Sequence, residues 1–316
     1  MSKPLVLQTE ELDASAAAWL GERCDLVACR VEEPRFAELL ARAEGLVVRT
    51  YTRVDAALLA GGPRLRVVGR AGVGLDNIDL AACAARGVRV VSTPDANSQA
   101  VAEFALALIV DAARPRLMLD RALDAKEWGR LRKELRAPRQ LSEMTLGVLG
   151  LGRIGARVAR MGVGIGMDVV YHDIREIPVD QRMGASSVSL AELCARADVL
   201  TVHVDPREAN RRLVSTPFLA MCKPTVVLIN TSRGLVLDDL ALAGFLRRNP
   251  KAQALLDVHD PEPFGPDYPL LGLPNAHLSP HIAAATATAQ ENMSWVVRDV
   301  WRVLDGKEPE FPAAQR

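Results

Sequence analysis

The 316-residue chain has no excess of either charge, because 39 lysines and arginines balance 39 aspartates and glutamates. This balance argues against nucleic acid and anionic membranes as partners, and favours a small molecule. The chain also lacks an apolar run long enough to cross a bilayer. Its first residues, MSKPLVLQTEELD, turn acidic where a signal peptide needs an apolar core. These absences predict a cytoplasmic protein.

Cysteine is scarce, and its pattern excludes two kinds of cross-link. The five cysteines are odd in number and widely spaced, with no C-x-x-C pair and no clustered histidines: Cys24, Cys29, Cys83, Cys194 and Cys222. We therefore expect reduced, mostly buried thiols and no metal site. No internal repeat or low-complexity segment is visible, and the length suits two domains.

What the chain does contain is a glycine motif, TLGVLGLGRIG, from Thr145 to Gly155. Gly150 permits a tight turn from strand to helix, Gly152 lets the backbone approach a pyrophosphate, and Gly155 lets helix and strand pack closely. A helix starting near Arg153 would point free amides at the phosphates. A bare G-x-G-x-x-G also occurs in ordinary helix-opening turns, so a second signal is needed.

Asp173 supplies that signal. It follows a second apolar run, residues 167–172, and lies about 20 residues beyond the glycines, where a dinucleotide site places an acidic residue for the ribose hydroxyls. Its carboxylate would repel a 2′-phosphate, so the pattern predicts NAD rather than NADP, although Arg175 nearby acts in the opposite direction.

Short apolar runs alternate with helical patterns on both sides of the motif, which predicts two α/β domains with doubly wound parallel sheets. The expected strands are 4–7, 25–29, 46–49, 65–68, 88–92, 145–149, 167–172, 199–204, 225–230, 252–257 and 275–278. The expected helices include 37–43, 80–85, 190–195 and 238–246.

Three longer segments carry their own expectations. Residues 97–125 have the spacing of buried helices broken near Pro115, and we expect them to link the domains and help form a subunit interface. Residues 127–139 are rich in arginine and lysine, which fits either a solvated surface or a phosphate site. Residues 284–304 predict one long amphipathic helix.

Ligands of such sheets bind beyond the carboxyl ends of the strands, so polar residues there are candidates for chemistry. Arg233 follows one strand beside a glycine and could grip a carboxylate, or form a surface salt bridge. Asp257 and Glu262 follow the next strand, and His281 the last one. A lone histidine is more often structural than catalytic. Hydride transfer to a carbonyl needs a proton donor, however, and an imidazole paired with a carboxylate provides one.

Together these motifs resemble the D-isomer-specific 2-hydroxyacid dehydrogenases, most of all their D-3-phosphoglycerate dehydrogenase members. The similarity runs over nearly the whole chain, through LVVRTYTRV, GRAGVGLDNIDL, STPDANSQAVAE, TLGVLGLGRIG, INTSRGLVLDDLAL, LDVHDPEP and LSPHIAAAT. It implies an NAD-dependent oxidoreductase with two Rossmann-like domains, the cofactor domain being inserted into a flavodoxin-like substrate domain. The implied boundaries are 1–98 plus 287–316 for the substrate domain and 99–286 for the NAD-binding domain.

The resemblance also implies roles for individual residues. The catalytic triad would be Arg233, Glu262 and His281. Substrate would meet Arg49, Arg70 and the backbone of Val73 and Gly74. The implied cofactor residues, with Asp257 on the nicotinamide amide and Val101 beside the ring, are Gly150, Gly152, Arg153, Ile154, Gly155, Asp173, Val101, His203, Val204, Thr231 and Asp257.

Further expectations follow from the same resemblance. The family's members are usually dimers joined through the cofactor domains, and their cleft closes over the substrate. The chain ends about where the two-domain core of the family ends, which implies a short form without the serine-sensing regulatory domain of longer phosphoglycerate dehydrogenases. The chain departs from the pattern at residues 204–207, VDPR, where relatives usually have a small or apolar residue followed by proline, so adenine contacts there are not expected to follow the family.

The substrate expected first is 3-phosphoglycerate, or phosphohydroxypyruvate in the reverse direction. A glyoxylate or hydroxypyruvate reductase would use the same triad on an acid without a phosphate. A protein of another class, an NADH-sensing binding protein similar to corepressors of this fold, would bind the cofactor without turnover.

Overall fold

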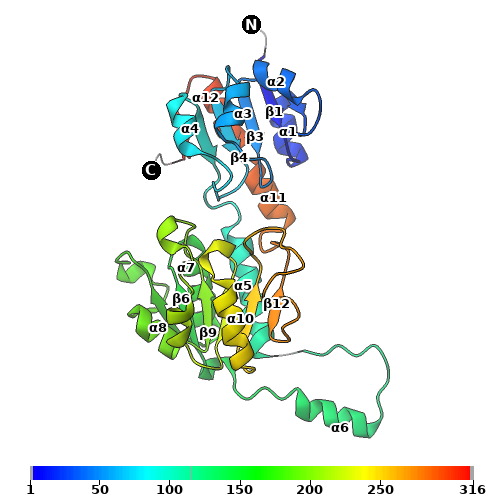
Figure 1. Cartoon of the computed structure of the whole chain (residues 1–316), viewed down its shortest axis with the longest axis vertical. Coiled ribbons are helices and arrows are strands. Elements are labelled where there is room, and N and C mark those ends of the chain that lie inside the picture. The colour runs from blue at the N-terminus through cyan, green and yellow to red at the C-terminus, as the bar shows by residue number, and fades with distance from the viewer. Residues whose placement is uncertain (1–2, 115, 314–316) are drawn as a thin grey trace. The chain divides into compact units, whose positions relative to one another are not determined.

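The computed structural model describes residues 3–114 and 116–313, and the chain divides into two compact units (Figure 1). The first unit comprises Met1–Asn97 and Ala284–Arg316, and the second comprises Ser98–Ala283. Each unit is a parallel sheet with helices on both faces, which confirms the predicted α/β class. Within the described ranges, no helix is both long and apolar enough to span a membrane.

The first unit has a five-stranded sheet in the order β2-β1-β3-β4-β5, the flavodoxin-like order. Its strands are β1 (Leu5–Gln8), β2 (Asp25–Ala28), β3 (Gly45–Val48), β4 (Val67–Arg70) and β5 (Arg89–Ser92). Its helices are α1 (Ala14–Gly21), α2 (Phe36–Arg42), α3 (Ala56–Gly61), α4 (Leu80–Ala85), α11 (Ala287–Ser294) and α12 (Val297–Leu304). Side chains of α1 and α12 share one core, and those of α2, α3 and α4 share the other.

The prediction of one helix over residues 284–304 is wrong, because the segment forms α11 and α12. The break falls at Trp295 and Val296. The Trp295 amide donates to the Glu291 carbonyl, four residues back, whereas the Val296 amide donates to the Met293 carbonyl, only three residues back. Trp295 makes an edge-to-face contact with Trp19, at 6.3 Å between ring centroids, and the Arg298 guanidinium lies over its ring. Periodicity alone does not show such a break, since neither proline nor glycine marks it.

The second unit has a seven-stranded sheet in the order β12-β11-β10-β9-β6-β7-β8, which is the Rossmann order extended by one strand. The strands are β6 (Thr145–Leu149), β7 (Asp168–His172), β8 (Ser186–Ser187), β9 (Val199–Val202), β10 (Val227–Asn230), β11 (Gln253–Leu256) and β12 (Ala276–Leu278). The helices are α5 (Ser98–Ala113), α6 (Ala125–Glu134), α7 (Arg153–Gly164), α8 (Leu190–Arg196), α9 (Thr216–Ala220) and α10 (Asp239–Arg248). Strands β9 and β10 are buried along their whole length, as expected for a sheet covered on both faces.

The segment after α5 differs from the rest of this unit. The predicted helical stretch 97–125 contains α5 and, at Ala125, the first residue of α6, and the break expected near Pro115 falls on a residue outside the described ranges. Helix α6 lies at the end of an extended segment that stands away from the sheet of its own unit, and none of its residues is buried (Figure 1).

Candidate active site

The glycine turn lies at the C-terminal end of β6. Gly150 has a φ of +90°, and a Cβ there would lie 2.8 Å from the carbonyl oxygen of His203. A Cβ on Gly155 would lie 2.0 Å from the carbonyl oxygen of Gly150. At Gly152, the N-cap of α7, a Cβ would meet no described atom within 4 Å. The turn is therefore closely packed toward the protein and open beside the first amides of α7, as a pyrophosphate requires.

Asp173 follows β7 and joins it to this turn. Its Oδ2 accepts a hydrogen bond of 2.8 Å from the Leu151 amide, and its Oδ1 accepts one of 2.9 Å from the Arg175 amide. Burial raises the pKa of the Asp173 carboxyl, but the hydrogen bonds from Arg175 and Leu151 lower the pKa by more than burial raises it, so the net shift is downward. Asp173 is thus an ionised acceptor at the edge of the glycine turn.

Two buried polar atoms on the same edge lack a hydrogen-bond partner in the described part of the chain: Nδ1 of His203, after β9, and Oγ1 of Thr231, after β10. The other ring nitrogen of His203 lies 2.9 Å from Oγ1 of Thr201. Burial lowers the pKa of His203 to about 4, so the ring is neutral at pH 7. Buried polar atoms are rarely left unsatisfied, and these two residues are both predicted cofactor contacts. The open turn and the two unsatisfied atoms fit a dinucleotide.

Glu262 and His281 are 2.7 Å apart, between Oε2 of the carboxylate and Nδ1 of the imidazole. The second carboxylate oxygen accepts a 2.7 Å hydrogen bond from the His259 amide. Burial raises the pKa of Glu262, but the hydrogen bonds from His281 and His259 lower the pKa by more than burial raises it, which keeps the carboxylate ionised. His281 has a φ of +55°, a strained conformation for a residue with a Cβ. The predicted pair is therefore formed, on loops after neighbouring strands β11 and β12.

Arg233 lies in the turn after β10, the next strand of the sheet. The buried Asn230 side chain shapes this turn, because its Nδ2 donates to the Arg233 carbonyl at 2.9 Å and its Oδ1 accepts from the Ser232 amide at 3.0 Å. A Cβ on Gly234 would lie 1.9 Å from the backbone carbon of His259, so the two turns are in direct contact. Arg233, Glu262 and His281 thus come from three adjacent strand ends.

A model of the D-isomer specific 2-hydroxyacid dehydrogenase, NAD binding domain, matches residues 106–283, more than half of the chain. The chain belongs to this family. The predicted family and its NAD cofactor are thereby confirmed, and the matched residues lie within the second unit.

Relatives within the family carry different names. The chain is 35% identical to a glyoxylate reductase from Aeropyrum pernix, over 95% of this chain and 92% of that one. It is 38% identical to a D-3-phosphoglycerate dehydrogenase from Mycobacterium leprae, over 92% of this chain but 55% of the longer relative. A solved D-lactate dehydrogenase from Aquifex aeolicus, complexed with NAD and lactic acid, matches with a TM-score of 0.81, 28% identity and 96% coverage of each chain.

Asp257, fully buried after β11, supports the histidine loop, the segment after β12 that carries His281. Its Oδ1 accepts from the Ile282 amide at 2.9 Å, and its Oδ2 from the Ala283 amide at 2.7 Å. Both oxygens therefore fix the backbone that follows His281. Its contact with the nicotinamide amide remains a prediction.

The remaining predicted residues are distributed over the two units. Arg49 follows β3 and Arg70 ends β4, with Val73 and Gly74 in the loop beyond, so all four lie at the C-terminal edge of the first unit's own sheet. The Arg49 guanidinium donates to the Glu11 carbonyl, and that of Arg70 to the Ala71 carbonyl. In the second unit, Arg153 and Ile154 open α7, Val204 lies two residues after β9 and Val101 is buried in α5. Their ligand contacts remain predictions.

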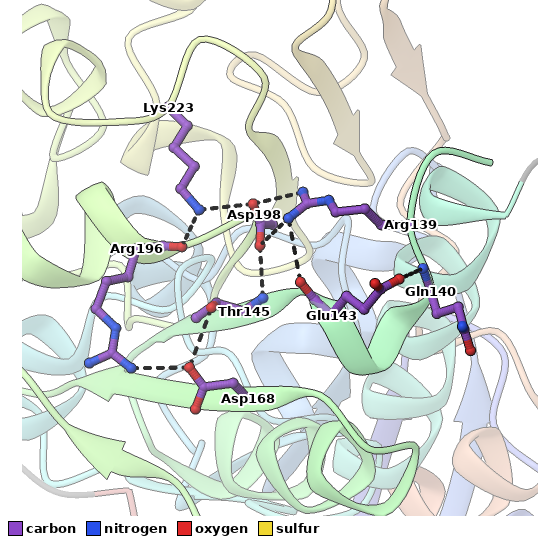
Figure 2. Close-up of polar contacts among 8 residues, drawn as sticks. All are labelled: Arg139, Gln140, Glu143, Thr145, Asp168, Arg196, Asp198 and Lys223. Carbon is purple, nitrogen blue, oxygen red and sulfur yellow. Dashed lines mark hydrogen bonds and ion pairs between the residues drawn. The ribbon is translucent and has the colours of Figure 1, made fainter.

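The basic segment 127–139 does not lie at the cofactor edge. Arg139 pairs at 2.9 Å with buried Asp198, which also binds Lys223 at 2.8 Å and accepts from the Thr145 amide at 2.9 Å (Figure 2). Asp198 and Thr145 lie where β9 and β6 begin, at the edge opposite the glycine turn. Arg130 pairs with Glu134 on the same helix. Arg139 therefore ties the segment that carries α6 to the sheet, which argues against the phosphate-site interpretation.

Sequence reasoning missed the residues that hold the site together. The roles of Asn230, Gly234 and His259 depend on contacts with other loops, and only Asn230, a buried amide at a strand end, has a local signal. Among the described residues, no group of three or more histidine, cysteine, aspartate or glutamate side chains is placed to hold a metal ion.

Proposed function

We propose that this NAD-dependent dehydrogenase interconverts a D-2-hydroxy acid and its 2-oxo acid, with Arg233, Glu262 and His281 as the catalytic residues. The observation that carries the proposal is the 2.7 Å Glu262–His281 pair at the C-terminal edge of an NAD-binding sheet. When bound, NAD(H) accepts or supplies the hydride. The protein must then supply a proton donor and acceptor for the substrate oxygen.

The geometry supports a division of roles. Glu262 holds Nδ1 of His281 and stabilises the imidazolium, which leaves Nε2 to exchange a proton with the substrate oxygen. Arg233 is suited to a two-pronged grip on the carboxylate and to polarising the neighbouring carbonyl. Positioned acid–base groups of this kind contribute roughly 10²- to 10⁴-fold in rate.

We propose NADH as the preferred cofactor over NADPH. The ionised Asp173 carboxylate lies at the end of β7, where it would accept from the ribose hydroxyls and repel a 2′-phosphate. Gly150, Gly152, Gly155, His203 and Thr231 would line the same edge.

The first candidate substrate is phosphohydroxypyruvate, or 3-phosphoglycerate in the reverse direction, supported by the 38% identity to the mycobacterial phosphoglycerate dehydrogenase. Glyoxylate or hydroxypyruvate is the second candidate. The placement of Arg139 favours it, because that part of the basic segment lies at the opposite edge of the sheet from the glycine turn. Arg49 and Arg70 then remain as the candidate basic residues for a phosphate.

The first unit would be the substrate domain, and a homodimer would form through the second. Exposed apolar side chains gather on the extended segment around α6: Leu117, Met118, Leu119, Trp128 and Leu135. Such a group of exposed apolar side chains is unfavourable on a segment surrounded by water but is typical of a subunit interface. A cytoplasmic location is supported by the five cysteines, all buried and all unpaired.

The test is NADH oxidation by the purified protein with phosphohydroxypyruvate, hydroxypyruvate and glyoxylate, each repeated with NADPH. We expect turnover with NADH, and preference for one acid selects the substrate. His281→Ala should abolish turnover while NADH binding persists. Unchanged turnover in that variant would refute the mechanism, and tight NADH binding without turnover in the wild type would indicate a cofactor sensor instead.

A further inference from the structure

His259 makes contacts on two sides of the site without belonging to the triad. The residue is 6% exposed, and its Nε2 lies 2.9 Å from the carbonyl oxygen of Ser279. A carbonyl oxygen only accepts, so Nε2 carries a proton and donates it. The ring packs edge-to-face on Phe264 and Tyr268, at 4.7 and 5.5 Å between ring centroids.

These contacts reach both partners of the catalytic pair. The His259 amide donates to Oε1 of Glu262, three residues further along the same loop. The His259 ring donates to Ser279, two residues before His281 on the neighbouring loop. A single residue therefore holds the carboxylate through its backbone and the histidine loop through its side chain.

We propose that His259 is a positioning residue that sets the separation of Glu262 and His281 by bridging their two loops. This inference rests on the proposed function, in which that pair transfers the proton. A general acid–base pair works only within hydrogen-bond reach, and a displacement of about 1 Å in such a site costs on the order of 100-fold in rate.

Tyr268, which donates to Asp239, packs beside the Nδ1 side of the His259 ring. The Tyr268 hydroxyl lies 3.3 Å from Nδ1 of His259 and donates to Oδ1 of Asp239 at 3.1 Å. Asp239 is the first residue of α10, so the chain of contacts ends on that helix. Because Nε2 donates to the Ser279 carbonyl, Nδ1 is the nitrogen that faces the Tyr268 hydroxyl, whose one proton is donated to Asp239, and a flipped ring would lose the hydrogen bond to Ser279.

Asn and Gln substitutions separate bridging from packing. The amide nitrogen of Gln at position 259 reaches the place of Nε2 and can donate to Ser279, whereas the shorter Asn side chain reaches only the place of Nδ1. His277, exposed on β12 near the same loop, is the matched control. Tyr268→Phe removes the hydroxyl beside Nδ1 and leaves the packing, so it tests the placement of the ring if a substitution at 259 prevents folding.

The experiment measures kcat, KM for the 2-oxo acid, the NADH dissociation constant and the pH profile of kcat/KM for each variant. We expect His259→Asn to lower kcat roughly 10- to 100-fold with NADH binding unchanged. Its alkaline limb should move to lower pH, because a displaced carboxylate stabilises the imidazolium less. His259→Gln should recover most of the rate, Tyr268→Phe should show a smaller loss of the same kind, and His277→Asn should match the wild type.

Wild-type kcat and pH profile in His259→Asn would overturn the inference, as would an equal loss in the Asn and Gln variants accompanied by weaker NADH binding. If the substitutions at 259 do not fold, a wild-type profile in Tyr268→Phe overturns it as well. Failure of the proposed function gives a different result, since the wild type would then show no turnover or His281→Ala would remain active.

Discussion

Asp173→Ala tests whether this carboxylate selects the cofactor. If the two ribose hydroxyls donate to the ionised carboxylate, each hydrogen bond contributes about 1.5–3 kcal/mol. Losing both, with partial compensation by water, should cost about 3 kcal/mol, which weakens NADH binding about 100-fold. The substitution also removes the acceptor of the Leu151 amide and loosens the glycine turn, which affects both cofactors equally.

NADPH should respond in the opposite direction relative to NADH. The Arg175 guanidinium contacts Asp173 at 3.3 Å and is mostly exposed. Without the carboxylate, the repulsion of a 2′-phosphate disappears and Arg175 can pair with it, which together favour NADPH by about 1 kcal/mol, or roughly fivefold.

The ratio of the two dissociation constants, obtained by fluorescence titration, isolates this effect because the loosened turn cancels. Asp168→Ala is the control, since Asp168 is exposed at the opposite end of the same strand. The double variant Asp173→Ala/Arg175→Ala should lose the part of the gain in NADPH binding that pairing with Arg175 provides. An unchanged NADH to NADPH ratio in Asp173→Ala would refute the assigned role, even if both cofactors bound more weakly.

Three further predictions concern other parts of the chain. Asp198→Ala should lower the free energy of unfolding by about 2–3 kcal/mol, or roughly 5–10 °C in Tm by calorimetry, because it removes the buried carboxylate that pairs with Arg139 and Lys223, two cations that remain partly exposed to solvent. The carboxyl pKa of Asp198 is lowered in the folded protein, so the difference in stability between the variant and the wild type should shrink below about pH 4. A difference that does not change with pH would contradict this. Burial raises the pKa of Asp239 from 3.8 to about 6, so its ionisation above that pH opposes folding, and Asp239→Asn should be more stable than the wild type at pH 8 but not at pH 4. For this half-buried side chain the gain is on the order of 1 kcal/mol, and equal thermal stabilities at pH 8 would count against it. If the proposed homodimer forms through the segment around α6, Trp128→Glu should lower the mass measured by light scattering from that of a dimer to that of a monomer, and a dimeric variant would contradict this interface.

The features that the sequence predicts well are local ones. The turn from Gly150 to Gly155 and the acid at Asp173 follow from backbone requirements within a few residues, and the structure has the expected strand, turn and helix there. Strand positions follow from apolar runs because both faces of each parallel sheet are covered.

The features that the sequence does not predict depend on distant partners. Arg139 looks like one cation among many until its partner Asp198, 59 residues away, is known. The break between α11 and α12 involves the packing of Trp295 on Trp19. In both cases a tertiary contact decides the outcome, and neither composition nor periodicity contains it.

The histidine loop shows why the same limit applies to the site itself. His281 has a left-handed backbone that costs on the order of 1–3 kcal/mol for a residue of this kind, so something must hold it there. Asp257 does so by accepting from the amides of Ile282 and Ala283, and the His259 ring holds the other side of the loop through Ser279. The DVHDPEP segment therefore has two tasks: it carries the carboxylate of the proposed catalytic pair, and it fixes the strained loop that carries the imidazole. A substitution at Asp257 or His259 should accordingly change the position of His281, although neither residue lies in the loop that carries this histidine.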